Sequence, residues 1–161
     1  MQSETKKKIS AYVIAIAIPL AVGALSALLT RGNMEIYGEI NMPPLAPPGW
    51  PFPVVWTVLY VLMGVSSALV YLKRERNPES AKRGLTYYAV SLVFNFFWSI
   101  IFFNLERYFF AFLWLLVLLY LIVKTILSYR KVSPLAAYLQ IPYAVWVAFA
   151  GYLNVAIWYL N

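Results

Sequence analysis

The sequence has no cysteine, no histidine and no aspartate among its 161 residues. Without cysteine there is no disulfide, no thiolate nucleophile and no thiolate metal site. Without histidine, the commonest general base and metal ligand is missing. The six acidic residues are all glutamates, and none lies inside a long apolar run. These absences argue against conventional hydrolysis, metal catalysis and proton-coupled transport, and we expect neither a metal nor another cofactor.

Charge is also scarce. Charged residues make up 12% of the chain and hydrophobic residues 63%, whereas a soluble domain carries about 25% charged residues. A bilayer-spanning helix needs about 20 apolar residues. Stretches of that kind occupy about 9–30, 52–72, 84–105, 109–129 and 135–160. They leave no room for a soluble domain, so we predict an all-α fold in which residues 1–161 form a single five-helix transmembrane domain.

The basic residues alternate along the chain in a way that indicates membrane topology. Basic clusters precede the first apolar run, separate the second from the third, and separate the fourth from the fifth. The other connections carry only Arg31 and Arg107. Because inner segments of membrane proteins are enriched in Lys and Arg, we predict a multi-pass protein with its N-terminus inside and its C-terminus outside. The net charge of +7 is then explained without a nucleic-acid partner.

A proline-rich connection, residues 31–51, separates the first two apolar runs. It is too apolar for disorder and too long for a simple turn. Prolines at positions 43, 44, 47 and 48 stiffen it, because each proline fixes its φ angle. Trp50 is expected at the membrane interface, and Trp56 about one turn inside. Two interpretations stay open: a structural loop with an aromatic belt, or a lid that closes a pocket on the outer side.

Three of the apolar runs place aromatic, small or polar residues on one helical face. Asn95 is mid-membrane, where its amide serves either an inter-helix hydrogen bond or a pocket wall. Small Ala150 leaves volume beside Trp146. Together these faces predict an apolar pocket with a few polar groups, suited to a flat, hydrophobic ligand that is uncharged at its centre. The faces comprise Ser91, Asn95 and Trp98; Trp146, Ala150 and Asn154; and Trp56, Tyr60, Gly64 and Ser67.

The first run contains Gly23 and Ala27 four residues apart. Small residues at this spacing let helices approach closely. The spacing is explained either by packing within the bundle or by a homodimer contact.

Several motifs occur together and in order: PP-x-x-PPGW-x-x-P-x-VW-x-x-LY at 43–60, N-x-x-WS-x-x-FF at 95–103, SPLAA at 133–137 and PY-x-x-W-x-x-FA-x-x-LN at 142–154. With these motifs the chain resembles, over nearly its whole length, the tryptophan-rich sensory protein/translocator protein family (TspO, or peripheral benzodiazepine receptor family). The resemblance implies a five-helix membrane bundle, often dimeric, whose outer pocket is closed by the loop between the first two helices.

The resemblance also implies ligands and site residues. The family pocket binds porphyrins and, in some members, cholesterol and isoquinoline carboxamides. Bacterial members are reported to degrade protoporphyrin in light, which would involve Trp56 and Trp146 here. The pocket positions carried over are Tyr37, Pro47, Trp56, Asn95, Trp98, Trp146 and Ala150. From their faces and position, Trp50, Tyr60 and Asn154 complete the predicted ligand-binding set.

Two departures from the family pattern matter. Leu45 stands where the family often has Trp, so the lid has one aromatic fewer. No basic residue follows Tyr152, so the sterol motif of animal members is incomplete and sterol binding is disfavoured. We expect a receptor or sensor for porphyrins in a bacterial cell membrane, with at most a light-dependent degrading activity. The alternatives are a carrier of tetrapyrroles or lipophiles without ion coupling, and a scaffold protein with a vestigial pocket.

Overall fold

The computed structural model describes residues 1–161 and confirms the all-α prediction. Five long helices follow one another along the chain, and each is long and apolar enough to cross a membrane. A 3-10 turn, η1 (Met34–Gly38), lies between the first two helices, and another, η2 (Arg74–Arg76), between the next two. A π-helical turn, η3 (Ile100–Asn104), extends the third. The helices are α1 (Gln2–Thr30), α2 (Pro51–Leu72), α3 (Pro78–Ser99), α4 (Tyr108–Arg130) and α5 (Pro134–Leu160).

Two helices extend beyond the apolar spans inferred from the sequence. α1 begins at Gln2 because Glu and Lys favour helix even where the sequence is polar. α3 begins at Pro78, where the Asn77 side chain accepts a hydrogen bond from the Ser80 amide at 3.1 Å. Arg83 pairs with Glu79 one turn apart at 2.7 Å, which adds support to this exposed first segment.

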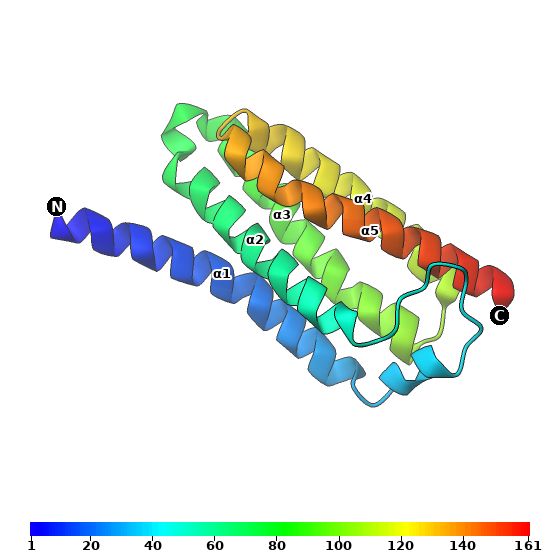
Figure 1. Ribbon diagram of the computed structural model, residues 1–161. Coiled ribbons are helices and arrows are strands. Elements are labelled where there is room, and N and C mark those ends of the chain that lie inside the picture. The colour runs from blue at the N-terminus through cyan, green and yellow to red at the C-terminus, as the bar shows by residue number, and fades with distance from the viewer.

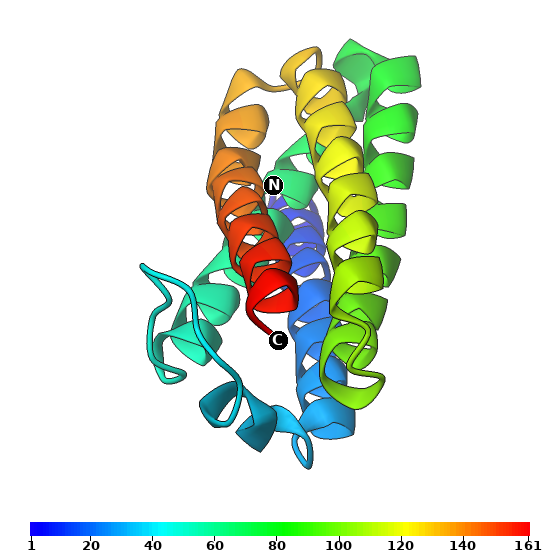
Figure 2. The same ribbon diagram turned by 90° about the vertical axis from the view of Figure 1, so that its right-hand side faces the viewer.

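The helices run up and down, so the connections gather at two ends (Figures 1 and 2). One end holds the N-terminus and the connections α2–α3 and α4–α5. The other holds the C-terminus and the connections α1–α2 and α3–α4. Arg31 and Arg107 are the only basic residues in the connections at this second end. We call the first the basic end and the second the cavity end.

Small residues allow α1 and α2 to pack closely together. A Cβ atom on Gly64 would overlap the backbone of Ile16, and one on Gly23 would overlap the ring of Tyr60. Gly23 therefore packs within the chain, as the first of the two sequence interpretations expected. Toward its N-terminus α1 diverges from the other helices (Figure 1).

The middle of the bundle and its basic end form a filled core. Its largest fully buried side chains include Met63, Tyr129 and Tyr143. Hydrogen bonds tie the buried polar groups across helices: the Ser66 hydroxyl donates to the Ala136 carbonyl at 2.7 Å, and the Gln140 amide donates to the Ser66 hydroxyl at 3.2 Å. In a bilayer, such bonds and close packing hold helices together, because lipid is as apolar as the helix surfaces.

Candidate functional site: an aromatic cavity under the α1–α2 connection

The α1–α2 connection is fastened to the cavity end by side-chain amides and phenols. The Asn161 side chain accepts from the Asn41 amide at 3.0 Å and donates to the Asn41 carbonyl at 3.1 Å. The Tyr152 hydroxyl donates to the Pro44 carbonyl at 2.8 Å. Near the other end of the connection, Asn33 donates to Asn104 of η3 at 2.8 Å. The Asn33 side chain therefore links two connections and does not cap η1.

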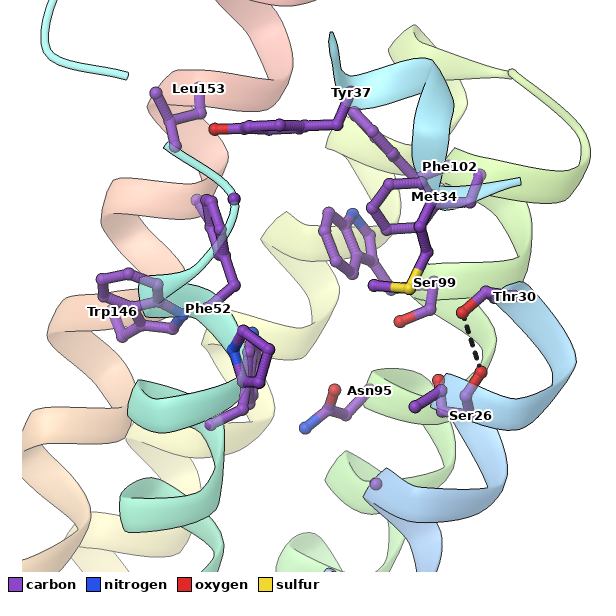
Figure 3. Close-up of a pocket in the computed structure, with 18 of the residues that line it drawn as sticks. Ser26, Thr30, Met34, Tyr37, Phe52, Asn95, Ser99, Phe102, Trp146 and Leu153 are labelled. Atoms are coloured by element: carbon purple, nitrogen blue, oxygen red, sulfur yellow. Dashed lines mark hydrogen bonds between the residues drawn. The ribbon is translucent and has the colours of Figure 1, made fainter. Parts of the chain in front are cut away.

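Tyr37, in the same connection, makes both a hydrogen bond and an aromatic contact. Its hydroxyl donates to the Pro47 carbonyl at 2.8 Å, and its ring meets Phe52 edge-on with centroids 5.3 Å apart. Partial burial raises the pKa of the Tyr37 phenol above its ordinary value, because the charged phenolate is poorly solvated there. Figure 3 shows Tyr37 reaching from η1 toward Leu153 of α5 across the top of a cavity.

Below Tyr37 lies a cavity of about 900 Å³, bounded by α1, α2, α3, α5 and the connection. Its volume is within the usual range of small-molecule sites, about 300–1,000 Å³. The structure brings together eight of the residues predicted from the sequence. They are Tyr37, Trp56, Tyr60, Asn95, Trp98, Trp146, Ala150 and Asn154.

Pro47 and Trp50 lie outside the cavity wall. The Pro47 carbonyl holds the Tyr37 hydroxyl instead. Trp50 directly precedes α2 with its side chain 74% exposed, as expected for an interfacial tryptophan. Gly49 and Phe52, its near neighbours, take the lining positions. Leu45, where the family pattern often has Trp, is 83% exposed and does not line the cavity.

The polar groups of the wall also join helices. The Asn95 amide donates to the Tyr143 hydroxyl at 3.2 Å. The Asn154 oxygen accepts from the Trp98 indole at 3.0 Å, while its nitrogen donates to the Tyr108 carbonyl at 2.6 Å. Asn154 thereby fixes the orientation of the Trp98 ring. Asn95 thus both bonds to another helix and lines the cavity.

The two tryptophans singled out for chemistry stand on α2 and α5. Trp56 stacks on Tyr60 with centroids 5.5 Å apart and meets Tyr143 edge-on at 6.2 Å. Trp146 meets Phe52 edge-on at 5.7 Å, and its indole nitrogen is buried without a hydrogen-bond partner. Figure 3 shows Trp146 and Phe52 together on the side of the cavity opposite Asn95 and Ser99. Such edge-on contacts hold aromatic rings in place.

Several wall residues were missed by sequence reasoning. α1 contributes a face that includes Gly23, Ala27 and Thr30, and its three- and four-residue spacing was available as a signal. Phe103 reaches the cavity from the π-helical turn, whose altered register no regular helical spacing indicates. Glu35 of η1 also lines the cavity. An isolated glutamate in a loop has no spacing pattern from which its position in the wall could be predicted.

The chemistry available in this cavity is limited. Aromatic faces and aliphatic groups dominate it, and its polar groups are amides, hydroxyls, indole N–H groups and one carboxylate. Nowhere in the chain do three His, Cys, Asp or Glu side chains gather as metal ligands. The arrangement suits a flat hydrophobic molecule held by stacking and shape.

A bundle of five membrane-length helices around an aromatic cavity defines a multi-pass membrane protein that binds hydrophobic small molecules. Residues 15–160 match the TspO/MBR family, and the chain belongs to this family. It is 36% identical over 150 residues to Protein CrtK of Rhodobacter capsulatus, covering 93% of this chain and 90% of that protein. It is 34% identical over 160 residues to Tryptophan-rich protein TspO of Chlorobaculum tepidum, covering 96% and 98%. The Translocator protein of Bos taurus is 34% identical over 145 residues, covering 89% and 86%.

Proposed function

We propose that this chain is a membrane receptor that binds porphyrins, such as protoporphyrin IX, and related flat hydrophobic molecules in the cavity at the cavity end. The observation that carries the proposal is the combination of volume and wall: about 900 Å³ lined by Trp56, Trp98 and Trp146. Aromatic faces of this kind stack on a planar macrocycle. The cavity residues come from one end of the bundle, while side chains such as Met63 and Tyr129 fill the rest. This favours a receptor over a carrier, which would need a path through the filled core.

The proposal includes an orientation in the membrane and one disfavoured class of ligand. With the basic end inside, as the Lys and Arg distribution indicates, the cavity opens toward the outer side of a bacterial cell membrane. Sterol binding at Tyr152 is disfavoured, because its hydroxyl is already bonded to the Pro44 carbonyl.

A binding titration tests the receptor proposal. Protoporphyrin binding is followed by quenching of tryptophan fluorescence in the wild type, Ala150→Leu and Ala148→Leu. Ala150 lines the cavity, whereas Ala148 on the same helix is exposed. We expect Ala150→Leu to weaken binding about tenfold, which corresponds to about 1.4 kcal/mol, and Ala148→Leu to bind as the wild type does. Equal effects of the two substitutions, or no saturable binding, would contradict the proposal.

We further propose that bound porphyrin is lost in light through Trp56 and Trp146. An indole is oxidised far more easily than a phenyl ring, whereas an aromatic pair contributes only about 1 kcal/mol beyond its buried area. Trp56→Phe and Trp146→Phe should therefore retain most of the affinity and lose light-dependent bleaching. Trp158→Phe is the control, because Trp158 packs on Phe109 outside the cavity. Bleaching at the wild-type rate in both cavity variants, measured against dark samples, would make the protein a binder only.

A further inference from the structure

The wall of the cavity carries charge of one sign only. Glu35 is its single charged residue, and no Lys or Arg lines it. The one ion pair of the structure joins Arg83 to Glu79 at the other end of the bundle. The Glu35 carboxylate therefore has no basic side chain within 4.0 Å to neutralise it.

Glu35 stands at the opening of the cavity. It lies on η1 between Met34 and Tyr37, which both line the cavity, and it is exposed to water. Figure 3 shows those two neighbours above the cavity interior. A group that enters or protrudes at this opening meets the Glu35 carboxylate.

The interior offers little to an anion. The Trp98 indole already donates to Asn154, and the Asn95 amide to Tyr143. The Thr57 and Thr30 hydroxyls donate to carbonyls of their own helices. The Trp146 indole is an unpaired donor, but a few neutral donors do not replace a cation, and an anionic group buried without a cation is strongly disfavoured. Carboxylates of a bound ligand are therefore held at the opening, beside Glu35.

Charged residues farther from the cavity opening do not reverse the negative charge that Glu35 places there. The connections at the cavity end hold three glutamates, Glu35, Glu39 and Glu106, and two arginines, Arg31 and Arg107, which leaves a net charge of −1. Neither arginine lines the cavity. Salt screens exposed charges over about 8–10 Å, so the residue at the opening dominates.

We propose that Glu35 makes the cavity charge-selective, favouring flat ligands that are neutral or cationic at their edge over ligands with carboxylates. This rests on the proposed function, since it specifies which porphyrins and related molecules the cavity takes. Glu35 is a specificity-determining residue that acts by repulsion at the opening, and the aromatic wall supplies affinity without regard to charge.

The experiment compares protoporphyrin IX with its uncharged dimethyl ester in the wild type, Glu35→Gln and Glu35→Lys. The measured quantity is the ratio of the two dissociation constants, because partition of the ester into detergent cancels when variants are compared. One charge pair at several ångströms in water changes affinity by about threefold. We therefore expect Glu35→Gln to shift the ratio about threefold and Glu35→Lys about tenfold toward the diacid, with the ester affinity unchanged. High salt should shrink both shifts.

Glu39→Gln is the matched control, since Glu39 is an exposed glutamate in the same connection that does not line the cavity. Its shift should be clearly smaller. Equal loss or gain of diacid and ester affinity in the Glu35 variants would show a structural role and overturn the proposal, as would a Glu39→Gln shift as large as that of Glu35→Gln. If the wild type binds neither compound, the porphyrin proposal fails and this one with it, whereas normal binding with an unchanged ratio overturns charge selectivity alone.

Discussion

Equally buried side chains have different surroundings at the two ends of the bundle. Ile122 on α4 and Ile157 on α5 are each 1% exposed. Ile122 belongs to the filled core with Leu118 and Tyr129, whereas Ile157 borders the cavity of about 900 Å³. Burial alone therefore does not distinguish a packing residue from the wall of a binding site.

The cavity stays open because its wall is held by directed contacts. Large rings such as Trp98 and Trp146 cannot collapse inward without breaking their ties: Trp98 is bonded to Asn154, and Trp146 is wedged against Phe52. In the filled core, side chains interdigitate and gain dispersion energy from all sides. The basic end of the bundle is therefore closely packed, whereas the cavity end is packed less completely and leaves a space that a ligand can fill.

The variants Ile122→Ala and Ile157→Ala test this difference in packing between the two ends most directly. Truncating a filled core position costs about 2–5 kcal/mol in soluble proteins. In a membrane protein we expect about 2 kcal/mol for Ile122→Ala, because lost dispersion rather than exposure to water dominates. Ile157→Ala should cost clearly less, since Ile157 packs in a cluster of four buried residues beside the cavity, whereas Ile122 packs in a core of 16. Unfolding in detergent without ligand measures both, and equal losses would contradict the difference in packing between the two ends.

The second test uses two glycines of similar burial. A methyl group on Gly64 would overlap the backbone of Ile16, whereas one on Gly151 would meet no heavy atom within 4 Å. Gly64→Ala should therefore destabilise the protein by about 1–3 kcal/mol through overpacking. Gly151→Ala should be neutral or stabilising by up to about 1 kcal/mol, because Ala favours helix. A stable Gly64→Ala variant would show that α1 moves freely against α2.

The sequence was sufficient for the helices and for eight of the 26 residues that line the cavity. Apolar runs and basic clusters predict where the helices lie, and four-residue spacings such as Trp146–Ala150–Asn154 predict a common face. These signals are local and periodic, which is why sequence reasoning captures them.

The α1 face was missed although it is periodic, whereas the parts of the site in the connections depend on tertiary contacts that leave no periodic trace. Trp50 and Phe52 are both aromatic and two residues apart, yet only Phe52 faces the cavity. That outcome depends on where α2 begins and on the Tyr37 tie to Pro47. Glu35 and the π-helical turn carrying Phe103 are likewise placed by the way the connections fold back.

The smallest expected effect concerns the hydrogen bond to Pro47 from Tyr37, which lies across the top of the cavity. A hydrogen bond of this kind contributes about 0.5–1.5 kcal/mol. Tyr37→Phe removes the bond and keeps the ring that meets Phe52. We expect bound porphyrin to dissociate about two- to fivefold faster, measured by displacement, with little change in overall unfolding. Tyr159→Phe is the control, because Tyr159 is 83% exposed.

The stabilisation by the Tyr37–Pro47 hydrogen bond should depend on pH in one direction only. A phenolate cannot donate, so deprotonation breaks the bond to the Pro47 carbonyl. Because burial raises the Tyr37 pKa above its ordinary value, the folded state holds the proton more tightly than the unfolded chain does. The stabilisation is therefore fully present below about pH 10, the ordinary value, and is lost as pH rises through the higher folded-state pKa. Other tyrosines also titrate in alkali, so the informative quantity is the difference in dissociation rate between wild type and Tyr37→Phe. That difference should be constant at neutral pH and vanish in strong alkali, and a difference that persists there would assign the slower release to ring packing instead of the hydrogen bond.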